Sequence, residues 1–278
     1  MTSCAGAGRC RFSGSIYIVK RLLLLFLLTP VGLYADWKIL DRRDSPGSYG
    51  KLAASELRVT DGAAEAEVDL VYFKPADVTL EVIANTDGQI RGLRELIEAR
   101  DGSAGINGGY FKANLEPVGL LISNDRLVHR LENAKLLSGI FYVKNGRPWL
   151  ARTREFPGTK GIEQAIQCGP FLVDGGRTVT GLENERVAAR TFIFSSGSSV
   201  WGFGICRAVT LQAMGEILSE ATLLPDHRII RALNFDGGSS TTFYLRTDER
   251  GIFSEGRPAV SNYLVVKVKA KNFSLIPR

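Results

Sequence analysis

The stretch Asn234-Phe-Asp-Gly-Gly-Ser-Ser-Thr-Thr242 continues an apolar segment, residues 229–235, that has the composition of a buried strand. A strand that runs into glycines lets backbone N–H groups turn toward one concave surface, and such a nest of N–H groups binds anions, phosphate included. The serines and threonines that follow add neutral hydrogen-bond donors. Asp236 is the carboxylate inside this stretch, which makes it the first candidate for a general acid, a general base or a nucleophile.

Other stretches share this design of a strand that ends in glycines or donors: Gly105-Ile-Asn-Gly-Gly-Tyr-Phe111, Cys168-Gly-Pro-Phe-Leu-Val-Asp-Gly-Gly176 and Arg190-Thr191. Arg190 offers a planar fork of donors suited to two phosphate oxygens. Taken singly, each stretch also has an ordinary structural explanation, because Asn-Gly-Gly and Asp-Gly-Gly commonly form turns and a lone arginine is commonly paired within the protein. For Asp174-Gly-Gly176 we favour the turn.

Strand signals dominate the chain after residue 66, because β-branched and aromatic residues recur in short runs. Asn124-Asp125 and Asn145-Gly146 lie between such runs and predict hairpin turns. Two segments have helical periodicity instead, residues 90–100 and 210–220, the second with Thr210 as its N-cap. These features predict an α+β fold: a single sheet-rich domain with mixed or antiparallel strands and two main helices.

Residues 67–270 form the predicted domain, and residues 36–66 form an N-terminal extension whose polar, irregular sequence up to about residue 60 predicts an edge or early strand. Residues 1–35 have the pattern of a signal peptide, with basic residues and no acid, then the apolar run Leu22–Leu28, then the small residue Ala35 at the cleavage site. The apolar run is shorter than the about 20 residues that cross a bilayer. We expect export to the periplasm or the extracellular space and no stable membrane span after cleavage, with an uncleaved anchor as the alternative.

The formal net charge of +6 depends largely on that N-terminal segment. Removing its four basic residues from the 35 in the chain leaves 31 against 29 acidic residues, a net charge of +2. So small an excess gives no support for a nucleic acid as partner.

Removal of the same segment leaves two cysteines, Cys168 and Cys206. An even pair in an exported chain predicts a disulfide. The alternative is a nucleophilic cysteine assisted by His129 or His227. The spacings typical of a zinc site or a nucleotide-binding loop are absent from the sequence, so we expect no cofactor, with an oxygen-ligated divalent cation left open.

Taken together and in this order, four motifs resemble the phosphodiester glycosidase family: Asn107-Gly-Gly-Tyr-Phe111, Cys168-Gly-Pro-Phe-Leu-Val173, Arg190-Thr191 and Asn234-Phe-Asp-Gly-Gly-Ser239. The resemblance extends from about residue 68 to residue 268. The family usually has a third glycine where this chain has Ser239, and its bacterial members are often described as exopolysaccharide-related. The resemblance implies an exported hydrolase that cleaves a sugar-1-phosphodiester, or a related cell-envelope glycan, to a free sugar and a phosphomonoester.

The resemblance and the chemistry of the side chains together assign roles. Asp236 is expected to act in catalysis while Asn107 and Asn234 orient the substrate, with Glu183 and Glu185 as reserve carboxylates. The expected substrate-binding residues offer N–H, hydroxyl or guanidinium donors: Gly108, Gly109, Gly169, Arg190, Thr191, Gly237, Gly238, Ser239 and Thr241. Two alternatives stay open: a non-catalytic module on the same fold that binds polysaccharide or cell wall, and a transferase that remodels exopolysaccharide.

Overall fold

The structure of the protein is a computed structural model, and the chain divides into two compact units, Met1–Tyr34 and Ala35–Arg278. It describes residues 36–47, 50–85, 91–197, 199–247, 252–254, 256 and 260–269, all in the second unit. The predicted signal peptide, residues 1–35, lies outside the described residues. Among the helices that the structure describes, none has the length and apolarity that a membrane crossing requires.

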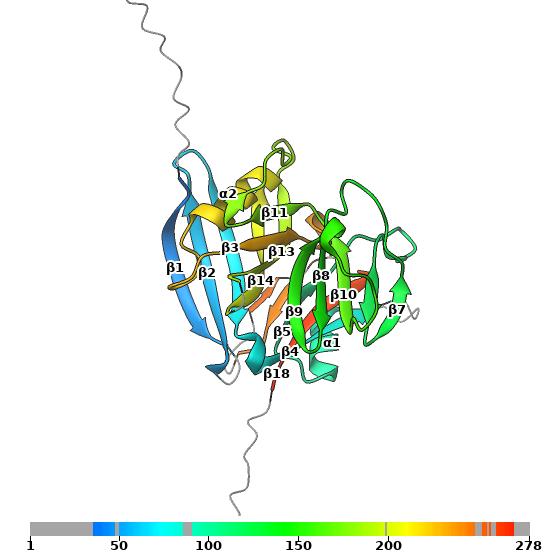
Figure 1. Cartoon of the computed structure of the whole chain (residues 1–278). Coiled ribbons are helices and arrows are strands. Elements are labelled where there is room, and N and C mark those ends of the chain that lie inside the picture. The colour runs from blue at the N-terminus through cyan, green and yellow to red at the C-terminus, as the bar shows by residue number, and fades with distance from the viewer. Residues whose placement is uncertain are drawn as a thin grey trace, which may run out of the picture. The chain divides into compact units, whose positions relative to one another are not determined.

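Within the described residues, the strands form three antiparallel sheets (Figure 1). The first has eight described strands, in the order β1 (Lys38–Pro46), β2 (Leu52–Thr60), β3 (Glu65–Phe73), β14 (Trp201–Val209), β13 (Ala188–Ser195), β15 (Arg231–Asn234), β11 (Phe171–Asp174) and β12 (Arg177–Thr178). The second has five, in the order β7 (Arg126–His129), β6 (Leu121–Ser123), β10 (Gln164–Cys168), β8 (Gly139–Lys144) and β9 (Arg147–Arg152). The third also has five, in the order β17 (Ile252–Ser254), β16 (Phe243–Leu245), β5 (Ala104–Asn107), β18 (Asn262–Val268) and β4 (Val78–Ala84).

The described part of the chain is mostly β, and its two α-helices, α1 (Leu93–Ala99) and α2 (Leu211–Glu220), are those that the sequence predicts. Short 3₁₀ turns add η2 (Pro75–Asp77), η3 (Thr153–Glu155) and η4 (Gly238–Ser240). The expectation of a single sheet is wrong. Strands that are close in sequence are divided between sheets by long-range pairing, as when β5 pairs with β16 and β18 near the end of the chain.

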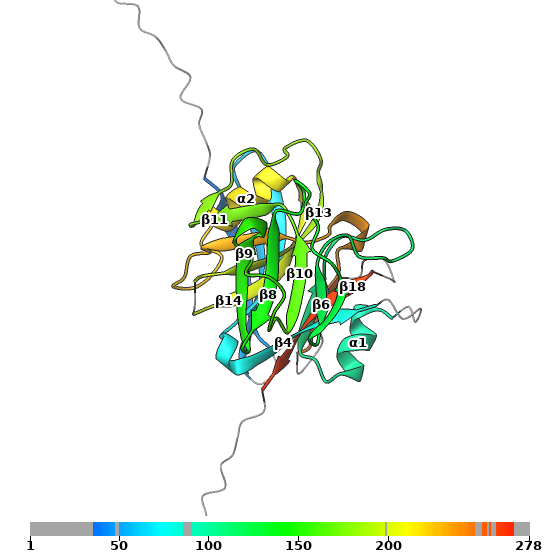
Figure 2. The same cartoon turned by 45° about the vertical axis from the view of Figure 1, so that its right-hand side comes forward.

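The apolar residues build several layers around the first sheet. One face of that sheet packs on the second and third sheets, through side chains such as Phe203, Ile193 and Phe141. The other face packs on α2, through Phe192 and Met214. The helix α1 packs separately on the third sheet, and Figure 2 shows α1 and α2 at opposite ends of the unit. The two cores hold the first sheet in place, so the ends of its central strands have fixed positions.

Residues 36–66 contain the strands β1 and β2, in agreement with the edge or early strand that the sequence predicts. The strands β1 and β2 pair along nearly their whole lengths, and β2 continues the pairing onto β3. The polar composition has a structural cause, because β1 is the edge strand of the first sheet and Asp41 and Arg43 are exposed on it. This segment is therefore part of the first sheet.

Local sequence signals account for the turns and for the second helix. Thr210 caps α2, since its Oγ1 accepts a hydrogen bond from the Ala213 N–H at 3.1 Å. In the β6–β7 turn, Asn124 and Asp125 have φ values of 50° and 61°, the left-handed conformation that asparagine and aspartate tolerate. Asn145-Gly146 does the same between β8 and β9. Both predicted hairpins are confirmed.

Candidate active site

Asn107, at the end of β5, ties together three segments that carry predicted site residues. Its side-chain Nδ2 donates to the main-chain oxygen of Asp236 at 2.7 Å. Its Oδ1 accepts from Thr191 Oγ1 at 2.8 Å and from the Thr242 N–H at 3.0 Å. Asn107 and Thr191 are both 0% exposed. They therefore stabilise the site from inside the protein, whereas the sequence predicted that they contact substrate.

The glycines after β5 fulfil a steric role. The Gly108 N–H donates to the Asn262 main-chain oxygen at 2.8 Å, and the Gly109 N–H donates to Asn262 Oδ1 at 2.8 Å. A Cβ on Gly108 would lie 1.9 Å from that Oδ1, so a larger residue would clash with Asn262. These N–H groups are occupied by the protein, so the predicted anion nest at Gly108 and Gly109 is wrong. No local sequence pattern indicates this pairing, because Asn262 is far along the chain from Gly108.

Tyr110 also lies at the site, although the sequence assigned it no role. Its hydroxyl donates to the Gly169 oxygen at 2.6 Å and accepts from Asn234 Nδ2 at 3.1 Å, and Asn234 Nδ2 also donates to Gly169 at 2.8 Å. A Cβ on Gly169 would lie 2.1 Å from the Leu136 oxygen, so this glycine too is required by close packing. Asn234 Oδ1 is buried and, among the described residues, has no hydrogen-bond partner.

The pKa of the Tyr110 phenol is shifted by several surrounding groups. Burial raises the pKa of the Tyr110 phenol, the charges of Cys168 and Asp236 raise it further, and the guanidinium of Arg190 lowers it. The net effect is a raised pKa, so the phenol stays neutral and keeps its donor proton. Tyr110 is therefore near both the carboxylate and the guanidinium that the sequence assigned to catalysis and binding.

Asp236 lies two residues after Asn234, the last residue of β15, and is half-buried. Its main chain is fixed on both sides, since its N–H donates to Gly108 at 3.0 Å and its oxygen accepts from Asn107. Its carboxylate Oδ1 accepts from the Gly237 N–H at 2.9 Å. The site thus holds a carboxylate of defined position at the end of a central strand, as the sequence predicts.

Arg190 is 8% exposed and is held by main-chain oxygens. Its Nη2 donates to the Arg186 oxygen at 2.6 Å and its Nε to the Val209 oxygen at 3.3 Å, while Glu183 lies 3.5 Å from Nη2 as an ion-pair partner. Burial lowers the pKa of Arg190. The structure thus supports the ordinary explanation of a paired arginine, and it also places Arg190 beside Tyr110.

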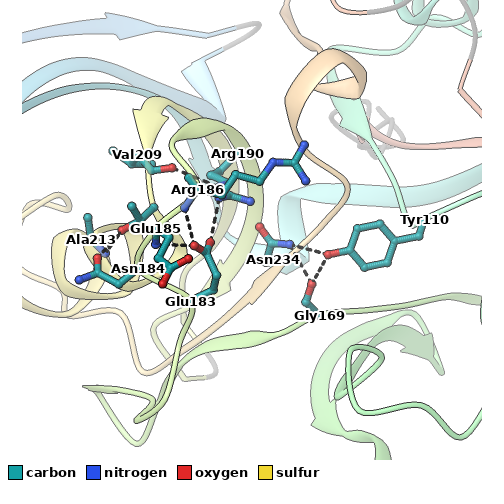
Figure 3. A network of polar contacts seen from close by, with 11 residues as sticks. Tyr110, Gly169, Glu183, Asn184, Glu185, Arg186, Arg190, Val209, Ala213 and Asn234 are labelled. Atoms are coloured by element: carbon teal, nitrogen blue, oxygen red, sulfur yellow. Dashed lines mark hydrogen bonds and ion pairs between the residues drawn. The ribbon is translucent and has the colours of Figure 1, made fainter.

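The loop before β13 is ordered by one carboxylate. Glu183 accepts hydrogen bonds from the N–H groups of Glu185 and Arg186 and pairs with Arg190 (Figure 3). Figure 3 shows this group on one side and Tyr110, Asn234 and Gly169 on the other. The predicted reserve carboxylate Glu183 therefore has a structural task, which is to orient the loop.

Arg186 is a second guanidinium that the sequence analysis missed. It is exposed, and its Nη2 lies 3.9 Å from the position that a Cβ on Gly238 would take. Gly238 has φ +63°, a conformation that glycine adopts freely. Gly237 packs against β13, where a Cβ would lie 2.7 Å from the Ala189 oxygen and 3.6 Å from Arg190 Cδ. Two arginines therefore flank the glycine turn that follows Asp236.

The remaining predicted binding residues line a cavity beside β13. Gly238, Ser239 and Thr241 line this cavity of about 410 Å³ together with Ala189, Ile205, Arg207, Ser254 and Gly256. The pairing of β13 with β14 shifts in register at this point, between Ala188 and Arg190. The segment from Asp236 to Thr241 therefore connects the candidate site to this cavity.

The predicted disulfide is absent, because Cys168 and Cys206 are free thiols in the structure. Cys168 ends β10 of the second sheet and Cys206 lies within β14 of the first. Both are fully buried, and burial raises the pKa of each thiol, so neither has the exposed thiolate that a nucleophile needs.

No group of three or more metal-ligating side chains occurs among the described residues. The favoured turn at Asp174-Gly-Gly176 is present between β11 and β12, with φ +60° and +77° at its glycines.

Comparison with known proteins places this geometry in context. A family profile described as phosphodiester glycosidase (NAGPA) matches residues 101–267. Among solved structures, the chain resembles the zebrafish N-acetylglucosamine-1-phosphodiester alpha-N-acetylglucosaminidase catalytic domain, auto-inhibited by its pro-peptide, with a TM-score of 0.59 and 15% identity over 82% of this chain and 88% of that one. It also resembles a hypothetical protein from Synechocystis, with a TM-score of 0.55 and 15% identity over 79% of this chain and 62% of that one. No curated protein sequence matches the chain.

Proposed function

Because the chain belongs to the phosphodiester glycosidase family, we propose that it hydrolyses the glycosidic bond of a sugar-1-phosphodiester. Water adds to the anomeric carbon, the bond from that carbon to the phosphate oxygen breaks, and the oxygen leaves with the bonding electrons. The products are a free sugar and a phosphomonoester. The zebrafish protein that shares the fold carries this kind of activity in its name.

One observation carries the proposal: Gly237, the residue after the half-buried carboxylate Asp236, packs against the buried Arg190, where a Cβ on Gly237 would lie 3.6 Å from Arg190 Cδ. Cleavage of this bond needs opposite charges at a short separation. A carboxylate stabilises the positive sugar in the transition state or activates water, while a cation stabilises the departing phosphate.

The chemistry of the leaving group fits the side chains present. A phosphate ester oxygen needs little protonation on leaving, because its conjugate acid already has a low pKa. Charge stabilisation is the larger requirement, and the guanidinium groups of Arg190 and Arg186 supply it as fork-shaped donors. Tyr110, kept neutral by its raised pKa, donates to the Gly169 oxygen and accepts from Asn234, so it holds these groups in place without adding charge. Asp236 has its backbone fixed by Asn107 and Gly108, so its carboxylate is positioned before substrate arrives.

A screen of the purified chain against sugar-1-phosphodiesters, with mass detection of the released sugar, tests this function. Release of free sugar together with a phosphomonoester supports it. Binding of a diester without release indicates the non-catalytic module. Transfer of the sugar to an added acceptor in preference to water indicates the transferase. No turnover and no transfer on any diester would contradict the proposal.

Export forms part of the same proposal, on the support of the signal-peptide pattern in residues 1–35. An exported enzyme of this class would meet cell-envelope or extracellular glycans. Amino-terminal sequencing of the protein recovered outside the cytoplasm should give a chain that starts after Ala35. A cytoplasmic protein with an intact amino terminus would contradict export and leave the proposed chemistry untouched.

A further inference from the structure

One face of the first sheet changes character along its strands. It is apolar where it packs in the core and charged toward one end of the sheet. On β2, Leu52 and Ala54 lie in the core, and Glu56 and Arg58 continue the same face by the two-residue periodicity of a strand. On β3, Val71 and Phe73 lie in the core while Glu67 and Asp69 continue that face. This face therefore leaves the core and becomes a polar surface.

The register of the strands sets these charges in rows. The first row runs Asp41, Arg58, Glu67 and Arg207, from β1 across to β14. The second runs Arg43, Glu56 and Asp69 and ends at Ile205. Acids and arginines alternate along the first row, whereas the second row sets the acids Glu56 and Asp69 side by side. The ion pair between Arg207 and the buried Asp69, at 2.8 Å, fixes the end of the rows nearest β13.

These residues line a groove of about 620 Å³, within the usual size range of a ligand site. Its opposite wall comes from β17, where Ile252 and the exposed Phe253 face it. Arg207 also lines the cavity of about 410 Å³ that contains Gly238, Ser239 and Thr241. The next residue of β17, Ser254, lines that second cavity. The two hollows therefore share Arg207 and one wall, and together they form a trough from β1 to the segment after Asp236.

Thr241 is an independent sign that this trough takes a ligand. It is 5% exposed and lines the second cavity, and its Oγ1 is buried with no hydrogen-bond partner among the described residues. A buried hydroxyl without a partner costs free energy, so a ligand hydroxyl that bonds to it is favoured.

We propose that the trough binds a neutral oligosaccharide, the glycan that carries the phosphodiester. Its charged lining consists of four carboxylates and three guanidiniums, so a polyanion would meet as much repulsion as attraction. Sugar hydroxyls both donate and accept, which suits a lining that mixes carboxylate acceptors with guanidinium donors. The exposed ring of Phe253 offers an apolar surface for the C–H face of a pyranose. This inference rests on the proposed function, since it names the substrate as part of a longer glycan.

The test measures binding and turnover separately on the full chain. The probes are neutral oligosaccharides from mannan, dextran and chitin, with a polyuronate oligosaccharide as the acidic comparison, and the binding measurement is calorimetric titration. Phe253→Ala and Arg58→Ala should each weaken binding of the preferred neutral probe by about tenfold, the cost of one good contact. Their turnover of a small sugar-1-phosphodiester should match that of the unmodified chain. Trp149→Ala removes an exposed aromatic side chain from the second sheet and should leave both quantities unchanged.

Each outcome has one meaning. Neutral probes that fail to bind, binding that Phe253→Ala and Arg58→Ala leave unchanged, or preference for the acidic probe would overturn the trough as a neutral-glycan site. Probe binding that depends on Phe253 and Arg58, in a chain that turns over no diester, would support the trough and count against the proposed function.

Discussion

The side-chain amide of Asn107 donates a 2.7 Å hydrogen bond to the main-chain oxygen of Asp236 and so links β5 to the segment that follows β15. The same amide accepts from Thr191 on β13. The proposed catalytic carboxylate therefore depends on a residue of the third sheet for its position. This relationship places Asn107 among the residues that position the site and outside the group that contacts substrate.

Asn107→Ala should lower the free energy of unfolding by about 3 kcal/mol, because it leaves three buried partners without their hydrogen bonds. Thr191→Val removes one of those bonds and nearly keeps the shape of the side chain, so it should cost about 1 kcal/mol. Urea unfolding of the three chains measures both values. Equal stability of Asn107→Ala and the unmodified chain would show that the hydrogen bonds of Asn107 do not stabilise the protein.

Arg186→Ala should raise KM for a sugar-1-phosphodiester by about tenfold, the loss expected for one charge-assisted hydrogen bond. Because Arg186 is exposed, thermal stability should stay unchanged. An aryl glycoside of the same sugar, which has no phosphate, supplies the control, and its KM should not move. Steady-state kinetics on both substrates provides the measurement, and an equal rise in KM on both would assign Arg186 a role unrelated to phosphate.

Tyr110→Phe should slow turnover by about tenfold, because it removes the hydroxyl that donates to the Gly169 oxygen and accepts from Asn234, and so loosens the position of both. The raised pKa of Tyr110 adds a second expectation. The phenol should stay neutral through the range near pH 10 where ordinary tyrosines ionise. Ultraviolet titration of the unmodified chain and of Tyr110→Phe should therefore coincide through that range. An extra tyrosine that titrates normally in the unmodified chain would contradict the burial of Tyr110.

Glu81 provides a pH test of stability away from the site. Burial raises its pKa, but hydrogen bonding and the charges of Lys267 and Arg100 outweigh burial, and the net pKa is lowered. A carboxylate with a lowered folded pKa stabilises the protein above its unfolded pKa, and that stability disappears as the pH falls through the folded pKa. Glu81→Gln should therefore destabilise the chain at neutral pH, and the difference should shrink in acid.

Denaturant unfolding at several pH values measures this difference. Glu98→Gln is the matched control, since Glu98 pairs with Arg94 at an exposed position and should contribute little. A destabilisation by Glu81→Gln that is the same at neutral and acid pH would contradict the assignment of the effect to charge.

Short-range signals predicted much of the local structure. Thr210 caps α2, and Asn145-Gly146 turns between β8 and β9, because both depend on residues within a few positions. The division into three sheets could not be predicted this way. It depends on pairings such as β5 with β18, and the hydrophobic pattern of a strand is the same whichever partner it takes.

The sequence anticipated part of the site's arrangement, and the catalytic and binding roles stay predictions. Asn234 bonds to Tyr110, and Gly237, the residue after Asp236, packs against Arg190. The glycines after β5 were misinterpreted because their N–H groups meet Asn262, a partner that no local pattern reveals. The extent of β1 could not be read from its sequence, because its charged residues line a groove at the edge of the sheet and resemble those of a loop.

The central claim is that Asp236 supplies the carboxylate for cleavage of a sugar-1-phosphodiester. Asn at this position keeps the Oδ1 that accepts from Gly237, so Asp236→Asn should unfold at the same temperature as the unmodified chain. Asp125→Asn, at an exposed turn, is the matched control and should keep full activity. The deciding measurement is release of free sugar by these three chains. The account predicts a loss of about 100-fold or more in Asp236→Asn alone, and turnover by Asp236→Asn equal to that of the unmodified chain would contradict it.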